Sequence, residues 1–214
     1  MSTMHLYIGN KNYSSWSLRA WLILRLAGTR FEETVIPLYR DDSAVKLRQH
    51  SPSQRVPALK HGGTVIWESL AIAEYLAELY PRADLWPRDA EARAVARAVS
   101  NEMHAGFAAL RTHMPMDMRA RYPRRDRAPA VEQDIRRILN IWDECRKRFG
   151  RQGAFLFGSY TIADAMYAPV VSRFMTYAVE LDSVAASYRD AVWHWPTMQE
   201  WVTAAQAESW VIEQ

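Results

Sequence analysis

The sequence contains a single cysteine, Cys145, so it cannot form a disulfide within one chain. Such sparing use of cysteine is typical of proteins in a reducing cytoplasm. The sequence also has no apolar run near the roughly 18 residues that a membrane-spanning helix requires. Its first residues lack the basic stretch followed by an apolar one that marks a secretory signal. We therefore expect a cytoplasmic protein that does not have a membrane as a partner.

A strong charge of one sign is also lacking, because 27 Lys and Arg residues stand against 24 Asp and Glu residues, a net charge of +3. This balance is too even to indicate nucleic acid as a partner by itself. The six histidines and the one cysteine show no zinc-ligand spacing, so we expect no metal site. The glycine patterns of nucleotide-binding loops are absent as well.

The composition present, with 49% apolar and 24% charged residues, is that of a chain that folds around a packed core. A length of 214 residues predicts one large domain or two small ones. Over the first 80 residues, short apolar runs alternate with helical periodicity. They predict strands and helices in the order β-α-β-α-β-β-α, at 4–8, 16–26, 33–38, 43–50, 56–60, 64–67 and 69–80.

The pattern changes after the segment 81–87, whose two prolines indicate a linker. Apolar residues three or four apart from Val95 to Met114 predict one long amphipathic helix. Further helices are predicted at 131–149, 161–178, 183–192 and 196–207, and no strand signal follows residue 90. We therefore expect two domains, an α/β domain at 1–80 and an all-helical domain at 88–214.

Three local motifs occur in a fixed order on these elements: Ser14-Ser15-Trp16-Ser17, Val56-Pro57 and Glu68-Ser69. In this order the chain resembles the glutathione transferase superfamily, which joins a thioredoxin-like domain to an all-helical one. The resemblance covers the whole chain. It is closest to the serine-type, zeta-like (maleylacetoacetate isomerase-like) bacterial members, whose first helix begins with a similar Ser-Ser-x-Ser-x-Arg run. Their usual Ser-Ser-Cys is Ser-Ser-Trp in this sequence.

The resemblance implies that a serine hydroxyl at the start of the first helix activates the thiol of glutathione. Ser14 aligns with the first serine of the family and is the predicted donor to the thiolate, with Ser15 as the second candidate. Only one of them can be the N-cap of the helix, and serine is favoured there even without a catalytic role. Because Cys-x-x-Cys is missing here, disulfide exchange by the protein itself is excluded.

The resemblance also assigns glutathione-binding residues to the first domain. It implies that the Val56–Pro57 peptide bond is cis and presents its backbone to the cysteinyl part of glutathione, whereas most X-Pro bonds are trans. Ser69 and the helix start would bind the γ-glutamyl carboxylate, and Glu68 its ammonium group. The same pair is also favourable as a plain helix start. Arg55, with Gln54 as a weaker candidate, would bind the glycine carboxylate or simply be solvated.

The second-substrate pocket is expected between the two domains, where ligand sites are common. Tyr13, His104 and Arg173 are the predicted lining residues, although His104 also lies beside a predicted core stripe. Arg173 resembles the substrate-carboxylate arginine of the zeta-like enzymes but falls about one helical turn early. Thr161 and Asp164 fit a capping box with a role in folding.

The expected function is an enzyme that binds glutathione as co-substrate and attacks a small electrophile by conjugation, isomerisation or peroxide reduction. The resemblance implies a homodimer with two-fold symmetry. The alternative is a non-catalytic module of the same fold that binds protein or RNA. Its support is the basic cluster of Arg119, Arg121, Arg124, Arg125 and Arg127.

Overall fold

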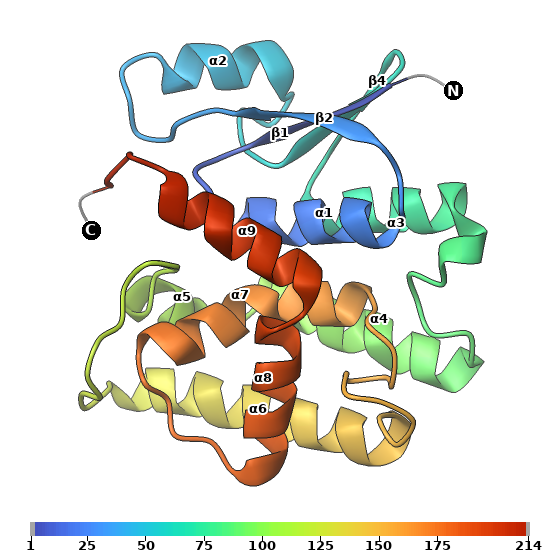
Figure 1. The fold of residues 1–214 in the computed structure, drawn as a ribbon, viewed down its shortest axis with the longest axis vertical. Helices are drawn as coiled ribbons and strands as arrows, with labels where there is room; N and C mark the ends of the chain where they lie inside the picture. The colour runs from blue at the N-terminus through green and yellow to red at the C-terminus, as the bar shows by residue number, and fades with distance from the viewer. Residues whose placement is uncertain (1–2, 213–214) are drawn as a thin grey trace.

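The structure is a computed structural model that describes residues 3–212; the outermost residues of the two predicted domains, 1–2 and 213–214, lie outside this range. A four-stranded sheet with helices on both faces lies at one end of the molecule, and a bundle of helices fills the other (Figure 1). No helix within residues 3–212 has the length and apolar character needed to span a bilayer.

The sheet consists of four strands in the order β2-β1-β3-β4. Their bounds are Met4–Ile8 for β1, Phe31–Val35 for β2, Ala58–His61 for β3 and Thr64–Trp67 for β4. Strand β1 pairs in parallel with β2 and antiparallel with β3, and the β3–β4 hairpin continues the sheet. Met4, Leu6 and Ile8 are buried, as expected for a strand between two neighbours.

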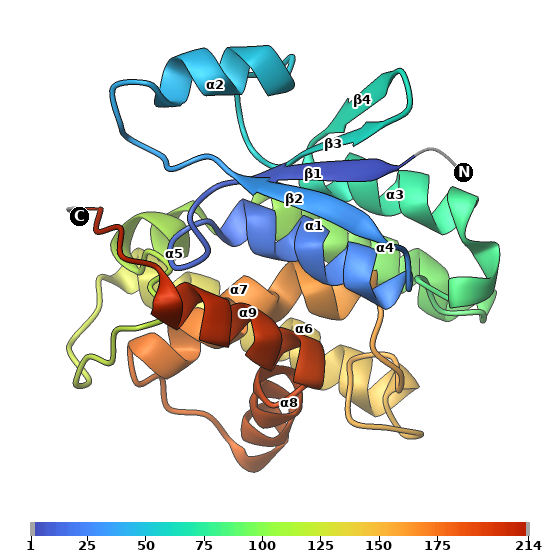
Figure 2. The same ribbon diagram turned by 45° about the horizontal axis from the view of Figure 1, so that its top comes forward.

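Three helices cover the sheet: α1 (Ser15–Leu26), α2 (Ser43–His50) and α3 (Ser69–Leu79). Helix α2 lies on one face, while α1 and α3 lie side by side on the other and face the helical bundle (Figure 2). Leu18, Leu22 and Ile72 are fully buried in the core between these layers. The N-termini of α1 and α3 therefore lie near the boundary between the sheet and the bundle.

The second half begins after a 3-10 turn, η1 (Pro81–Ala83), and consists of helices. Their bounds are Ala90–Ala105 for α4, Ala108–His113 for α5, Pro129–Phe149 for α6, Ile162–Thr176 for α7, Ser183–Trp193 for α8 and Pro196–Ala207 for α9. Helix α7 is the centre of the bundle, since almost all of its residues are buried, and it packs against α1, α4 and α8. One hydrophobic core thus runs continuously from α1 into the bundle.

Two predicted elements differ from the structure. The strand predicted at 33–38 is β2 at Phe31–Val35, because its length is set by the five residues of β1 and Pro37 cannot donate to the sheet. The single helix predicted from Val95 to Met114 is broken into α4 and α5 at Gly106, which has extended backbone, and Phe107, which has a φ of 61°. The apolar spacing continues across the break, so periodicity alone does not reveal it. Every other predicted element lies within two residues of its observed bounds.

Candidate active site

The start of α1 is built around the hydroxyl of Ser14. Ser14 is the N-cap, and its Oγ accepts a hydrogen bond of 3.3 Å from the backbone N–H of Ser17. The backbone N–H of Ser14 donates to Asn10 O at 2.8 Å, which fixes the turn that leads into the helix. Ser15 is already the first helical residue. Of the two candidate serines, Ser14 is therefore the one at the positive end of the helix dipole in the N-cap position.

Ser17 is a member of this site that sequence reasoning missed. Its Oγ lies 2.7 Å from Ser14 Oγ and accepts a 2.9 Å hydrogen bond from the backbone N–H of Gly9. A Cβ at Gly9 would lie 2.7 Å from Leu38 Cδ1 and 3.2 Å from Ser14 Cβ, so glycine allows Leu38 and Ser14 to pack against this part of the loop. The sequence does contain a signal for this contact. Ser14 and Ser17 are three residues apart at a helix start, a spacing that places both hydroxyls on the same side of the helix.

A pocket of about 100 Å³ brings together several predicted glutathione-binding residues. It is lined by Trp16, Ser53, Arg55, Val56, Pro57 and Glu68. The Val56–Pro57 peptide bond is cis, as the resemblance implies. Gln54 precedes these residues with an exposed side chain and a φ of 56°, and it does not line the pocket.

The start of α3 provides polar groups beside this pocket. Ser69 is fully buried, and its hydroxyl has no hydrogen-bond partner among the residues that the structure describes. Leaving such a group unpaired costs about 1–3 kcal/mol, which a ligand that accepts its hydrogen bond would recover. The preceding Glu68 is exposed, has a φ of 68°, and its carboxylate lies 3.6 Å from His104 Nε2. These groups fit the charged amino-acid end of a peptide such as glutathione.

Trp16, which replaces the cysteine of the zeta-like motif, forms one wall of the pocket. Its ring lies close to two cations. The guanidinium carbons of Arg19 and Arg111 lie 4.5 Å and 4.7 Å from the centre of its ring. Arg19 is completely buried and donates from Nε to Met166 O at 3.0 Å. Burial, together with the neighbouring Arg111 and Arg173, lowers the pKa of Arg19. The charges of Arg19 and Arg111 therefore lie behind the Trp16 side of the pocket, which favours a bound anion there.

His104 lies against this cationic group rather than in the second-substrate pocket. Its ring contacts the ring of Trp16 edge-on, with centroids 5.2 Å apart. Burial and the charge of Arg19 lower the pKa of His104, while Glu68 opposes the shift. The imidazole is therefore largely neutral at neutral pH.

A larger cavity, of about 790 Å³, lies where the first domain meets the helices. It is lined by Tyr13, Leu38, Tyr39, Arg40, Thr112, Pro115, Met116, Val211 and Ile212. Tyr13 is thus the predicted second-substrate residue that the structure places at this cavity. Arg173 lies elsewhere: it is buried in α7 and donates to Met114 O at 2.7 Å and Pro169 O at 3.0 Å. Burial and the charge of Arg111 lower its pKa to about 9.

The predicted capping box at the start of α7 is confirmed. Asp164 accepts from the backbone N–H of Thr161 at 2.8 Å and from its hydroxyl at 3.1 Å. Its other oxygen accepts from Leu156 N and from the Tyr188 hydroxyl, each at 3.1 Å. Burial raises the pKa of Asp164 to about 6 despite these hydrogen bonds. The box lies in the core of the bundle and serves the fold.

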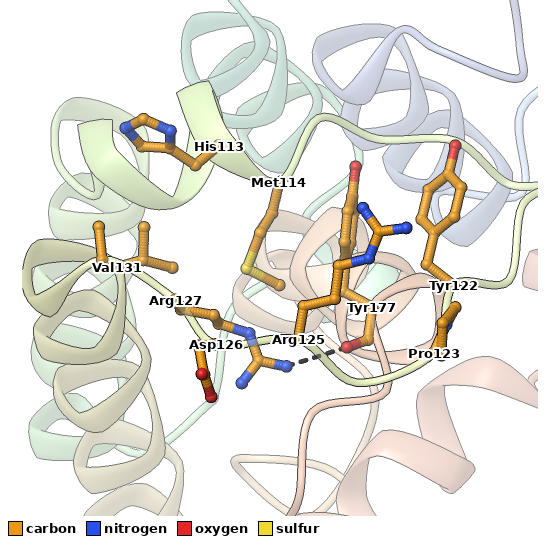
Figure 3. A pocket seen from close by; sticks show the side chains of 10 residues that line it. His113, Met114, Tyr122, Pro123, Arg125, Asp126, Arg127, Val131 and Tyr177 are labelled. Atoms are coloured by element: carbon orange, nitrogen blue, oxygen red, sulfur yellow. Dashed lines mark hydrogen bonds between the residues drawn. The ribbon is translucent and has the colours of Figure 1, made fainter.

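The basic cluster after α5 is largely bound to its own chain. Arg121 donates to Met118 O, Arg124 pairs with Glu180, and Arg127 donates to Tyr177 O. Arg125 and Arg127 border a further pocket of about 380 Å³ between α5, α6 and the end of α7, to which Met114 and Tyr122 also contribute (Figure 3). None of the predicted site residues lines this pocket. Across residues 3–212 there is no cluster of His, Cys, Asp and Glu suited to a metal ion.

The strand order and the helical second half define a thioredoxin-like domain joined to a helical domain, as in glutathione transferases. Residues 13–79 match the family model for the glutathione S-transferase N-terminal domain, and residues 128–203 match that for the C-terminal domain. These ranges cover more than half of the chain, which therefore belongs to the glutathione S-transferase superfamily. The predicted fold class is confirmed.

Curated relatives and solved structures agree with this assignment. The maleylacetoacetate isomerase of Rattus norvegicus is 28% identical over 172 residues, 78% of this chain and 77% of that protein. The probable maleylacetoacetate isomerase of Caenorhabditis elegans is 38% identical over 94 residues, and the match spans 44% of each chain. A crystal structure of a Burkholderia glutathione transferase homologue with bound glutathione superposes with a TM-score of 0.74 at 25% identity, covering 96% of this chain and 100% of that one.

Proposed function

We propose that the protein is a glutathione-dependent enzyme in which the Ser14 hydroxyl donates a hydrogen bond to the thiolate of glutathione. Two proton arrangements satisfy the hydrogen bonds around Ser14. When Ser17 donates to Ser14, the Ser14 oxygen accepts from both the N–H and the hydroxyl of Ser17, and its own proton is available to a ligand. A thiolate at the start of α1 needs a donor and would therefore favour this arrangement.

The magnitudes are sufficient for a thiolate at neutral pH. A free thiol has a pKa of about 8.5, and lowering it to about 6.5 requires roughly 2.7 kcal/mol. A hydrogen bond to a charged acceptor contributes about 1.5–3 kcal/mol. A partly buried helix N-terminus adds roughly 0.3–2 kcal/mol. The positive charges of Arg19 and Arg111 behind Trp16 act in the same direction.

The single observation that carries the proposal is the buried, unpaired hydroxyl of Ser69 beside the pocket at Val56 and Glu68. In this proposal Ser69 and the N-terminus of α3 bind the γ-glutamyl carboxylate, and Glu68 binds its ammonium group. The backbone of Val56 binds the cysteinyl part like an added strand. Arg55 pairs with the glycine carboxylate.

The second substrate is a small electrophile held in the cavity at Tyr13. The isomerase names of the rat and nematode relatives support cis–trans isomerisation as one outcome of thiolate addition, and conjugation is the other. Because Arg173 is buried and bonded to backbone carbonyls, we assign no substrate contact to it. Arg40, which lines the cavity, is the cation that would meet an anionic group of the substrate.

We further propose that the enzyme is a homodimer, as the family resemblance implies, and light scattering would measure its mass. The binding-module alternative loses its main support, because four arginines of the basic cluster have partners within the chain. They are Arg119, Arg121, Arg124 and Arg127. A protein that bound RNA through them would have to give up these contacts.

The proposal is tested by calorimetric titration with glutathione and by the ultraviolet absorbance of the bound thiolate as a function of pH. We expect binding of glutathione and a thiol pKa below that of free glutathione in the wild type. In the Ser14→Ala variant the pKa should return toward the free value and turnover should fall at least tenfold. Absence of glutathione binding, or an unchanged thiol pKa in Ser14→Ala, would contradict the proposal.

A further inference from the structure

Arg119, in the loop between α5 and α6, joins two distant segments at the second-substrate cavity. Its Nη1 donates to Glu208 O at 2.7 Å, and its Nη2 donates to Trp210 O at 2.9 Å. The same Nη2 lies 2.9 Å from the hydroxyl oxygen of Tyr13, to which it donates. One side chain thus holds both the residue that precedes Ser14 and the chain after α9.

A second set of hydrogen bonds closes the same junction. The Glu208 carboxylate accepts from the backbone N–H of Lys11 at 2.6 Å and of Asn12 at 3.0 Å. Asn12 in turn donates to Asp117 Oδ1 at 2.9 Å and accepts from Arg119 N at 3.0 Å. The loop before α1, the loop after α5 and the tail after α9 are therefore tied into one unit.

This unit forms part of the wall of the cavity. Val211 and Ile212, which directly follow the tethered Trp210, line the cavity together with Tyr13. The guanidinium of Arg119 makes three side-chain hydrogen bonds that diverge to two carbonyls and a phenol, which suits the rigid donor fork of arginine and not the single ammonium group of lysine. Arg119 therefore fixes the position of the tail and of the Tyr13 ring at once.

The direction of the Arg119 bond also determines what Tyr13 can do. Because the phenol oxygen accepts from Arg119, the Tyr13 proton is directed to another acceptor. A hydroxyl that accepts from a cation is a stronger donor, since hydrogen bonds in a chain polarise one another. Tyr13 is thus suited to donate to an oxygen on which negative charge develops during the reaction.

We infer that Tyr13, positioned by Arg119, is a catalytic hydrogen-bond donor to the carbonyl oxygen of the second substrate, and that Arg119 fixes the tail wall of its pocket. The inference rests on the proposed function and concerns its reaction with unsaturated carbonyl compounds, in which negative charge develops on a carbonyl oxygen. The thiolate forms a C–S bond at the β-carbon, the C=C π pair moves toward the carbonyl oxygen, and Tyr13 stabilises the resulting enolate. The proton released from the thiol returns to the α-carbon through water, which completes the addition.

The experiment compares two electrophiles that differ in having an acceptor oxygen. They are trans-4-phenyl-3-buten-2-one, which carries a carbonyl group, and benzyl chloride, which has none. For Tyr13→Phe we expect kcat to fall 10- to 100-fold with the ketone and less than threefold with benzyl chloride. In the same variant the Kd for glutathione should remain within a factor of two of the wild-type value. The pKa of the bound thiol should remain within about 0.3 of the wild-type value.

Arg119→Lys and Arg119→Ala test the positioning role. Both should reproduce the ketone-selective loss of kcat, raise the KM for both electrophiles several-fold, and speed the removal of the C-terminal residues by carboxypeptidase Y. Arg124→Ala is the matched control from the same loop, because Arg124 pairs with Glu180 instead. It should leave kcat, KM and the digestion rate unchanged.

An equal loss of kcat with both electrophiles in Tyr13→Phe would overturn the donor role, and unchanged digestion and KM in Arg119→Ala would overturn the tether. Failure of the proposed function has a different signature. In that case the wild type would neither bind glutathione nor turn over either electrophile, whereas the digestion rates of the Arg119 variants would still report on the tail.

Discussion

The hydroxyl oxygens of Ser14 and Ser17 lie 2.7 Å apart at the start of α1, and the Ser17 oxygen also accepts from the backbone N–H of Gly9. The backbone of the first loop therefore orients Ser17, and Ser17 orients Ser14. In this chain the Ser17 proton can be donated to Ser14, which leaves the Ser14 proton available to a ligand. Of these residues, only Ser14 needs to touch the thiolate, so Ser17 is a positioning residue.

Ser17→Ala should consequently impair the thiol without touching it. Removal of the hydroxyl leaves the Gly9 N–H without its acceptor and Ser14 without its oriented partner. We expect the pKa of bound glutathione to rise in the same direction as in Ser14→Ala but by a smaller amount, with a several-fold loss of turnover at pH 7. The pH dependence of thiolate absorbance measures this, with Ser15→Ala as the control that should behave like the wild type. A pKa as low as that of the wild type in Ser17→Ala would exclude the positioning role.

Ser69→Ala should have opposite effects on the free and the bound protein. In the free protein the buried Ser69 hydroxyl has no hydrogen-bond partner within residues 3–212, so its removal should leave the free energy of unfolding unchanged or slightly higher. In the complex the same change removes a hydrogen bond to a carboxylate, worth about 1.5–3 kcal/mol. Glutathione should therefore bind roughly 10- to 150-fold more weakly.

Urea denaturation and calorimetric titration measure the two effects of Ser69→Ala separately. Ser100→Ala is a suitable control, because Ser100 in α4 also has a buried hydroxyl with no partner in the described part of the chain but belongs to the bundle. That variant should keep the wild-type affinity for glutathione. A large loss of stability in Ser69→Ala without any loss of affinity would show that the hydroxyl serves the fold and not the ligand.

Local sequence signals predicted most of the fold and part of the site. Apolar periodicity and caps locate helices such as α2 and α9, and the serine run locates the N-terminus of α1, because these signals act within a few residues. The role of Arg119 was not predictable, since its partners at Tyr13 and Glu208 are remote in sequence and meet only through packing. The burial of Arg173 depends likewise on how α7 packs in the bundle.

The break between α4 and α5 escaped prediction because the apolar spacing continues across it, and it provides a test of its own. A Cβ at Gly106 would lie 2.8 Å from the backbone oxygen of Glu102, closer than atoms normally approach. Gly106→Ala should therefore destabilise the protein by about 1–3 kcal/mol, as measured by urea denaturation. Gly63→Ala is the control, because a Cβ there would meet no atom within 4 Å. Equal stability of the two variants would show that the α4–α5 junction adjusts freely.

Asp164 should make the stability of the protein depend on pH in a direction unusual for a carboxyl group. Burial raises its pKa to about 6 in the folded state, whereas its ordinary value is 3.8. Between these two values the folded state keeps a proton that the unfolded state releases, so the free energy of unfolding falls as pH rises. The full contribution, about 2–3 kcal/mol, is present below pH 4 and is lost above pH 6.

Asp164→Asn removes this titration while keeping the shape of the side chain. The amide has one acceptor oxygen in place of two, so the variant should be less stable at every pH. Beyond that constant loss, the advantage of the wild type should shrink by about 2 kcal/mol between pH 4 and pH 7 in urea denaturation. Asp84→Asn is the control that should show no such slope between pH 4 and pH 7, because the hydrogen bond from Arg88 lowers the pKa of Asp84 and this carboxyl stays ionised across that range. Parallel curves for the wild type and Asp164→Asn would mean that this carboxyl is ionised throughout the range.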